Sequence, residues 1–443
     1  MLKKTLPLTC ALAVFLAITT ARAQIINLSG DLLKEVQTIT NNMPRAYSEG
    51  FIKPTSGELA KWGNVVKALL DGSFTQADAL VRASFPSYQL FRFTDTGYLN
   101  RVYYLLREKY PVVKGWGTHL VNPAYARQIA IEVPHAKFDT NTELEGVDIF
   151  RKTGARFMII NGTARCANRA KTPCSGTWTS CGGGKYPESD MAHFVAVAFQ
   201  VAHQTLAARK PPMYAFNLHG NDDSVCEDFF FSNGLSNGSQ PLLFSLKSSL
   251  LAQGGVTAGV AGDGVSTCTQ IGSTNVQGRF TNGSPNPCTQ NAAATNGYFI
   301  HVEQSLRVRT QLSLYTKLIN AINANIPAVA PKVSAADEVA ADDRASAASE
   351  PPPQFHLMAA PNPFFANGSQ PSATIQFNLP EAGWATVKIY DVTGKEVTTL
   401  ANQPLPAGVH RLSLEARALP SGVYFCRLQA GARSQTIRLN LLK

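Results

Sequence analysis

The spacing of apolar residues divides the chain into a mixed helical and β part followed by an all-β part. Residues 24–85 carry apolar side chains at helical spacing, for instance Leu59, Trp62 and Val66, and predict an N-terminal helical layer. Short β-type runs come next, namely YQLFRF, RVYYLL, THLVN and QIAIEV, and from there strand-like and helix-like runs alternate. This alternation predicts an α/β fold, a mixed sheet with helices on both faces.

Two long helices are expected to cover that sheet. Residues 189–208 place Phe194 and Val197 on one apolar face, with Ser189 as the N-cap. Residues 304–325 repeat the helical spacing of apolar side chains. We expect each helix to pack its apolar face on the sheet.

The composition changes twice towards the C-terminus of this 443-residue chain, which is longer than one core usually serves. Residues 24–330 form the expected α/β domain. Residues 331–356 are rich in Ala, Ser, Asp, Glu and Pro, cannot bury a core, and predict an acidic linker. Residues 357–443 show short alternating runs separated by Gly and Pro, which is typical of a small immunoglobulin-like β-sandwich.

Residues 1–23 have the features of a cleaved secretory signal peptide. Lys3 and Lys4 precede an apolar run over residues 8–18 that is too short to span a bilayer, and Ala23 ends a small-residue cleavage site. The protein is therefore expected to be exported through the periplasm. No later run is long and apolar enough to span a membrane, so we expect no integral membrane segment.

Charge and cysteine content narrow the class of protein. Lys and Arg outnumber Asp and Glu by 40 to 30, but the basic residues are scattered, so nucleic acid is not an expected partner. Of the 8 cysteines, Cys10 belongs to the signal and Cys426 to the terminal module. The others fit up to three disulfides, and a thiolate zinc site is less favoured because no CxxC spacing occurs. They are Cys166, Cys174, Cys181, Cys226, Cys268 and Cys288.

Three motifs characterise the terminal module. PNPF occupies residues 361–364, IYDVTG residues 389–394 and LPSGVY residues 419–424, and Gly394 and Gly422 suit turns that need a positive φ. This pattern closely resembles the type A sorting domains of the type IX secretion system. The resemblance implies that the type IX machinery is a partner and that the protein is secreted or displayed at the cell surface. The alternative is an ordinary immunoglobulin-like binding or spacer domain.

Four strand-like runs each lead into polar residues. QIAIEV precedes His135, RFMII precedes a loop with Arg165, MYAFNL precedes His219, and YFIHV precedes Glu303. In open α/β sheets, ligands bind beyond the carboxyl ends of the strands. We therefore expect these four side chains to face one crevice.

The loop after QIAIEV supplies one more polar side chain. Thr142 and Glu145 form a capping-box pattern, which predicts a helix beginning at Glu143. His135 and Asp139 then lie in the preceding loop, where both are free to converge on a cation.

The expected metal ligands are His135, Asp139 and His219. Two imidazoles and a carboxylate with one open position form a catalytic zinc set, so zinc is the expected cofactor. Glu303 is then expected to act as the base that deprotonates the attacking water, and Arg165 is the second expected catalytic residue. Since a guanidinium fork matches a carboxylate, further polar residues are assigned to binding the substrate carboxylate. They are Asn168, Arg169, Arg307 and Arg309.

The order of these pieces over residues 131–310 resembles the superfamily of N-formylglutamate amidohydrolases, poly-γ-glutamate hydrolases and zinc carboxypeptidases. The resemblance implies a carboxypeptidase-like sheet and hydrolysis of an amide or peptide bond near a carboxylate. Three features depart from it: the first loop lacks the glycines common in those families, an aspartate replaces the frequent glutamate ligand, and the cysteine-rich insert of residues 166–181 is foreign. The matching pieces are His135 with Asp139 and Thr142, Asn168-Arg169, Asn217-Leu218-His219-Gly220, and Val302-Glu303 leading to Arg309.

Other interpretations compete with the hydrolase. The same scaffold without turnover would be a cell-surface binding protein for peptides or peptidoglycan fragments. His193 is interpreted as a partner of Asp190 rather than a ligand, and His203 as an ordinary helix residue. The GLSNG run at residues 234–238 matches G-x-S-x-G, but a loop follows where a nucleophile elbow needs a helix, so a serine hydrolase is not expected.

Overall fold

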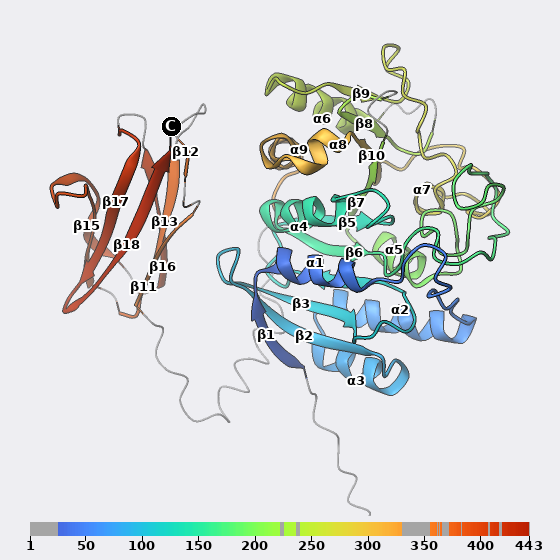
Figure 1. Cartoon of the computed structure of the whole chain (residues 1–443), viewed down its shortest axis with the longest axis horizontal. Coiled ribbons are helices and arrows are strands. Elements are labelled where there is room, and N and C mark those ends of the chain that lie inside the picture. The colour runs from blue at the N-terminus through green and yellow to red at the C-terminus, as the bar shows by residue number, and fades with distance from the viewer. Residues whose placement is uncertain are drawn as a thin grey trace, which may run out of the picture. The chain divides into compact units, whose positions relative to one another are not determined.

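The chain consists of two compact units, Met1–Val339 and Ala340–Lys443, in a computed structural model (Figure 1). The boundary falls within the expected linker. The expected signal peptide lies outside the described residues, as does the linker except for its last two residues. The structure describes residues 25–221, 226–235, 240–329, 355–360, 362, 364–365, 372–381, 383–405, 408–415 and 419–442.

A ten-stranded sheet forms the centre of the described part of the first unit, in the order β1-β2-β3-β4-β6-β5-β7-β10-β8-β9. The neighbours β6, β5, β7 and β10 are parallel, whereas β10 pairs antiparallel with β8. The predicted mixed sheet is therefore confirmed, and the carboxyl ends of its four central strands lie at one edge. The strands are β1 (Ile26–Gly30), β2 (Tyr88–Asp95), β3 (Arg101–Glu108), β4 (Thr118–Val121), β5 (Arg127–Val133), β6 (Ala155–Ile160), β7 (Tyr214–Gly220), β8 (Phe229–Ser232), β9 (Ala258–Val260) and β10 (Phe299–Gln304).

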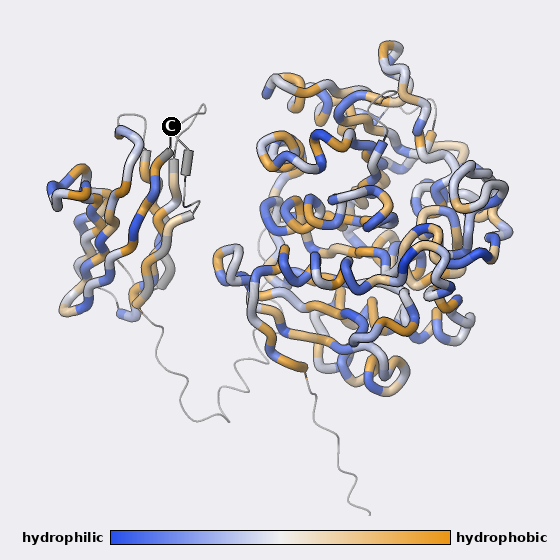
Figure 2. The backbone as a smooth tube through the Cα atoms, viewed as in Figure 1, coloured by the Kyte–Doolittle hydropathy of each residue, from blue (hydrophilic) through white to orange (hydrophobic). Residues whose placement is uncertain are grey.

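Helices cover both faces of the sheet, as predicted. One hydrophobic core joins the sheet to α1, α4, α6, α8 and α9, and a second joins it to α2, α3, α5 and α7. Figure 2 shows the alternation of hydrophilic and hydrophobic residues along these helices. The helices are α1 (Leu32–Asn42), α2 (Ser56–Leu70), α3 (Phe74–Ser84), α4 (Thr142–Thr153), α5 (Ala198–Ala207), α6 (Pro241–Ala252), α7 (Val276–Thr281), α8 (Leu306–Thr310) and α9 (Leu312–Asn325).

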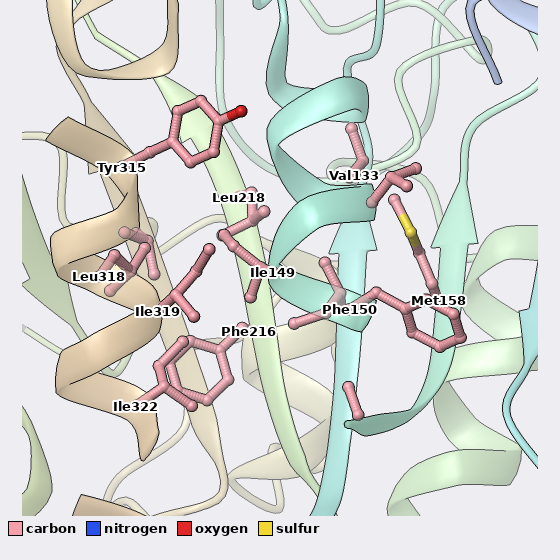
Figure 3. Close-up of a cluster of buried hydrophobic side chains, with 14 of the residues drawn as sticks. Val133, Ile149, Phe150, Met158, Phe216, Leu218, Tyr315, Leu318, Ile319 and Ile322 are labelled. Carbon is pink, nitrogen blue, oxygen red and sulfur yellow. The ribbon is translucent and has the colours of Figure 1, made fainter. Parts of the chain in front are cut away.

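Apolar side chains at alternate positions of the central strands pack in the first core. Figure 3 shows Phe216 and Leu218 of β7 between Ile149 of α4 and Ile319 and Ile322 of α9. All five side chains are buried. Residues 217 and 219 point to the opposite face because successive side chains of a strand alternate.

The N-terminal segment differs from the predicted helical layer. Ile26–Gly30 is a strand, β1, that pairs in parallel with β2. The three helices that follow are divided between the two faces, with α1 in one core and α2 and α3 in the other. A strand of five residues is too short for its alternation to stand out from the helical pattern beside it.

Three helix predictions need correction. The helix expected over residues 189–208 begins only at Ala198, because the buried Ser189 and Asp190 side chains hold the preceding backbone in turns. The helix expected over residues 304–325 is divided into α8 and α9. Helix α4 begins at Thr142 rather than Glu143 and has no capping box, since the Thr142 hydroxyl donates to the carbonyl oxygen of Asp139 (2.8 Å).

Three disulfides join the main unit, which confirms the prediction from the cysteine count. They link Cys166 to Cys181, Cys174 to Cys288 and Cys226 to Cys268. Cys426 is a buried free thiol of the second unit. In the GLSNG run, Ser236 and Gly238 lie outside the described residues. Within the described part of the chain, no helix is both long and apolar enough to cross a membrane.

The described residues of the second unit form two β-sheets. A three-stranded sheet in the order β11-β13-β16 and a five-stranded sheet in the order β12-β18-β17-β14-β15 share one buried core. The strands are β11 (His356–Ala360), β12 (Phe364–Phe365), β13 (Ser372–Leu379), β14 (Gly383–Tyr390), β15 (Glu396–Leu405), β16 (Gly408–Glu415), β17 (Gly422–Ala430) and β18 (Arg433–Leu442).

The IYDVTG motif of this unit forms the turn between β14 and β15. The Asp391 carboxylate accepts hydrogen bonds from the backbone N–H of Thr393 (2.8 Å) and Lys395 (3.1 Å). Gly394 has the expected positive φ of 82°. Gly422 does not, because it begins strand β17 and pairs with Leu441, so the turn predicted there is wrong.

A buried carboxyl on α4 makes a testable contribution to stability. Burial raises the pKa of Glu145 from its ordinary value of 4.5 to about 8, although the charge of Arg309 opposes the rise. The folded state therefore holds a proton that the unfolded chain releases above about pH 4.5. The free energy of unfolding is expected to fall as the pH rises from about 4.5 to about 8.

The substitution Glu145→Gln is expected to abolish this fall and to raise the free energy of unfolding at pH 8 by a few kcal/mol, because the amide has no proton to lose. Urea unfolding of both chains at pH 5, 6.5 and 8, with the disulfides intact, measures the difference. An equal dependence on pH in both chains would show that Glu145 is ionised in the folded protein.

Candidate functional site

The carboxyl ends of β6, β5, β7 and β10 open into a cavity of about 310 Å³. Strands β7 and β10 pair so that His219 lies beside Glu303, while His135 and Arg165 follow β5 and β6 in loops. All four side chains line the cavity. The structure thus brings together the four polar residues expected in one crevice, although His219 and Glu303 lie within their strands rather than beyond them.

The loop after β5 folds back on itself. The carbonyl oxygen of His135 accepts hydrogen bonds from the backbone N–H groups of Phe138 (3.0 Å) and Asp139 (2.9 Å). Lys137 adopts the left-handed conformation that this turn needs, with a φ of 73°. The loop therefore returns the Asp139 carboxylate to the imidazole of His135.

Three ligand atoms meet in the cavity. Oδ2 of Asp139 lies 3.4 Å from Nδ1 of His135 and 3.5 Å from Nδ1 of His219. The backbone N–H of Gly220 donates to the same oxygen (3.1 Å) and ties the loop to β7. One ligand atom from each of the three side chains lies within 4.8 Å of the other two, a grouping that can hold a metal ion.

Electrostatics favour a cation at these atoms. Burial alone would raise the pKa of Asp139, but its interactions with the neighbouring His135 and His219 outweigh burial and hold the pKa well below its usual range. Burial lowers the pKa of His219 to about 4. At neutral pH the cavity therefore presents an ionised carboxylate and a neutral His219 imidazole.

Asp190 contacts His135 on the side of the ring that faces away from Asp139. Its buried carboxylate contacts Nε2 of His135 (2.9 Å) and Nδ1 of His193 (2.8 Å), and accepts a hydrogen bond from Nε of Arg165 (2.7 Å). Burial opposes ionisation, but Arg165 and the histidines outweigh it and hold the pKa of Asp190 well below its usual range. Because an ionised carboxylate only accepts, Nε2 of His135 carries a proton that it directs at Asp190.

The Glu303 carboxyl lies beside the ligand atoms. Its Oε1 is 3.5 Å from Nε2 of His301. With its NH₂ oriented towards Glu303, the Gln270 amide donates to both carboxyl oxygens (3.2 and 3.3 Å). Burial, reinforced by the charge of Asp139, raises the pKa of Glu303 well above its usual range. A buried carboxyl with this pKa is a candidate proton acceptor and donor.

Aromatic rings surround the Arg165 guanidinium. Its Cζ lies 4.4 Å from the ring centre of Trp178, 5.3 Å from that of Phe138 and 5.9 Å from that of Tyr186. Tyr186 also stacks on His193, with ring centres 3.6 Å apart. Among the described residues that line the cavity, Arg165 is the one arginine, and no lysine accompanies it.

Two predicted substrate-binding residues are held outside the cavity. The Asn168 amide oxygen accepts a hydrogen bond from the backbone N–H of Ser189 (3.1 Å), so this side chain stabilises the loop. The Arg169 side chain is 79% exposed and faces Glu49 at 3.8 Å. The structure does not bring either residue to the site, since neither lines the cavity.

The two remaining arginines are also engaged elsewhere. Arg307 pairs with Asp228 next to β8. Arg309 is buried and donates to the carbonyl oxygen of Gln304 (3.2 Å). Its guanidinium packs on Gly220, where a Cβ would come within 2.5 Å of the Arg309 Cζ. Neither side chain lines the cavity, so neither is placed to bind a substrate there.

Sequence reasoning missed several residues of the site. His301 was not predicted, but it shares one face of β10 with the predicted Glu303 because the two are two positions apart, and this spacing is a usable signal. Trp178 and Tyr186 lie in a loop region without periodicity, so no pattern pointed to them. Asp190 was noticed only as a partner of His193.

The comparisons with known proteins concern chiefly the second unit. Residues 361–441 match the secretion system C-terminal sorting domain. No protein of curated function matches the chain. PorZ, an essential bacterial surface component of the type-IX secretion system of Porphyromonas gingivalis, is similar at 21% identity over 20% of this chain and 11% of its own, with a TM-score of 0.14. The endo-β-1,4-mannanase from Thermotoga petrophila is similar at 8% identity over 71% of this chain and 64% of its own, with a TM-score of 0.15.

The family match confirms the resemblance of the terminal module to sorting domains. The module indicates export of the protein, to the cell surface or as a secreted form, and implies interaction with the type IX secretion machinery. The resemblance of residues 131–310 to amidohydrolases and carboxypeptidases stays a prediction. The TM-scores of both solved structures are too low to bear on the fold of the main unit.

Proposed function

We propose that the main unit is a zinc-dependent hydrolase that cleaves an amide or peptide bond near a carboxylate of its substrate. The observation that carries this proposal is the meeting of His135, Asp139 and His219 in one cavity with Glu303. Ligands bound tetrahedrally at ~2.0–2.1 Å from zinc lie roughly 3.4 Å from one another. The separations of 3.4 and 3.5 Å between Asp139 and the two imidazoles fit this arrangement.

The chemistry of the donor atoms supports the same ion. Nδ1 of His135 is buried and makes no hydrogen bond, and Nδ1 of His219 belongs to a neutral ring. His135, Asp139 and His219 would hold the ion. When bound, zinc polarises the scissile carbonyl and makes water a stronger acid at neutral pH.

Glu303 fits the role of general base. Its raised pKa makes the carboxylate a better proton acceptor than an ordinary glutamate. It is therefore suited to take a proton from the attacking water and to pass it to the leaving amine. The Gln270 amide fixes the carboxyl by contacting both oxygens.

Arg165 limits the substrate class. With Asn168, Arg169, Arg307 and Arg309 held elsewhere, Arg165 alone supplies a guanidinium to this cavity among the described residues. Its Nε is engaged by Asp190, which fixes its orientation. The substrate we propose therefore carries one carboxylate close to the scissile bond, beside a planar or apolar group that packs on the surrounding aromatic rings.

A chelation experiment tests the proposal. The full chain is incubated with N-acyl amino acids and with peptides of free and amidated C-terminus, before and after treatment with 1,10-phenanthroline. We expect turnover of substrates with a free carboxylate, a fall of at least ~100-fold on removal of zinc, and recovery on its return. Amidated substrates are the matched control, because they lack the group that Arg165 binds.

Binding of these compounds without turnover, unchanged by chelation, would instead identify a surface binding protein. Turnover that survives complete removal of metal would contradict the zinc-dependent mechanism.

A further inference from the structure

A chain of buried hydrogen bonds runs beneath the cavity, on the face of the sheet covered by α5 and α7. It begins at His219, whose Nε2 lies 2.6 Å from Oδ1 of Asn217. Nδ2 of Asn217 donates to Oε2 of Glu132 (3.0 Å). Oε1 of Glu132 contacts Nδ1 of His203 (2.7 Å), and Nε2 of His203 contacts the Thr281 hydroxyl (2.7 Å). Asn217, Glu132 and His203 are fully buried.

The Glu132 carboxylate fixes the orientation of the Asn217 amide. Because Nδ2 of Asn217 donates to Oε2 of Glu132, the NH₂ of Asn217 faces Glu132 and its carbonyl oxygen faces His219. That oxygen cannot donate. The hydrogen bond at 2.6 Å therefore requires the proton of His219 to be on Nε2.

A second contact fixes the same orientation independently. The Asn275 side chain caps α7 by accepting a hydrogen bond from the backbone N–H of Gly278 (3.0 Å). Its NH₂ is thereby directed at Oδ1 of Asn217, to which it donates (3.0 Å). Oδ1 of Asn217 thus receives donors from two sides, and a rotated amide would oppose both Asn275 and Glu132.

We infer that Glu132 and Asn217 are positioning residues that set the tautomer of His219. With the proton held on Nε2, the lone pair of Nδ1 faces Asp139, where the proposed ion would bind. The value of this tautomer for metal binding rests on the proposed function. The tautomer itself can be measured in the metal-free protein. His203, expected to be an ordinary helix residue, secures Glu132 from α5.

The tautomer is measured on the metal-free full chain by long-range ¹H–¹⁵N correlation of its histidine rings, with the His219 signals assigned from His219→Ala. We expect the Nε2–H form in the wild-type chain. Asn217→Leu removes the acceptor at similar volume, so the Nδ1–H form, which can donate to Asp139, is expected to predominate. Zinc affinity, measured by chelator competition, should then fall by ~10–100-fold, as for loss of other outer partners of metal-bound histidines.

Thr281→Val is the matched control. It removes a buried hydrogen bond from the far end of the chain and leaves Asn217 and Glu132 in place, so the His219 tautomer and zinc affinity should match the wild type. Asn217→Ala removes the same acceptor without adding bulk and replaces Asn217→Leu if the leucine variant does not fold.

An Nδ1–H form in the wild type, or an Nε2–H form that survives both substitutions of Asn217, would overturn the inference. A wild-type chain that shows the expected tautomers but binds no zinc would leave the positioning role intact and contradict only the proposed function.

Discussion

Zinc affinity is expected to fall by more than ~100-fold in the variant Asp139→Asn, more than the loss of an outer hydrogen-bond partner causes. Oδ2 of Asp139 lies 3.4 Å from Nδ1 of His135 and 3.5 Å from Nδ1 of His219. The amide keeps the shape of the side chain but removes its negative charge. Competition with a chromophoric chelator on the full chain measures the change.

Asp148→Asn is the control for burial of a carboxylate. Asp148 is also buried, pairs with Arg151 and Lys152, and does not line the cavity. Its replacement should lower the free energy of unfolding while zinc affinity stays within ~2-fold of the wild type. Equal zinc affinities for Asp139→Asn and the wild type would remove Asp139 from the ligand set.

The second large effect is expected from Glu303→Gln, which should lower kcat by ~10²–10⁴-fold while zinc stays bound. The amide preserves the volume of the side chain but cannot accept a proton. The substrate found in the chelation experiment supplies the assay, and zinc content is measured on the same samples.

Glu145→Gln provides the matched comparison for this variant. It exchanges another buried carboxyl of raised pKa for an amide, outside the cavity, so kcat should equal that of the wild type. Wild-type turnover by Glu303→Gln would exclude Glu303 as the base, and loss of zinc from this variant would assign it to the ligands instead.

Much of the fold could be predicted because alternation and helical spacing are local properties of the sequence. The runs QIAIEV and MYAFNL are strands β5 and β7, and the end of each led to a residue of the site. The order of strands in the sheet was not predictable, since it depends on contacts between distant segments. The residues before Ala198 do not form the predicted helix. The Asp190 side chain accepts hydrogen bonds from Arg165 and from the backbone N–H of Ala192, and these contacts outweigh helical propensity.

The candidate site was predictable where a residue stood at or just beyond the carboxyl end of a strand-like run. His135 and His219 meet this condition, and Asp139 lies one tight turn from His135. The roles expected for the other arginines depended on the direction of long side chains, which sequence spacing does not determine. Arg309, for example, lies against Gly220 beneath the cavity because that glycine leaves room for the guanidinium.

The most direct test of the zinc site is the anomalous diffraction of crystals of the full chain grown with one equivalent of zinc, measured on both sides of the zinc absorption edge. If His135, Asp139 and His219 hold zinc, one anomalous peak lies within ~2.0–2.2 Å of Nδ1 of His135, Nδ1 of His219 and a carboxylate oxygen of Asp139. A cavity without such a peak, or zinc bound only by other residues, would contradict this ligand set.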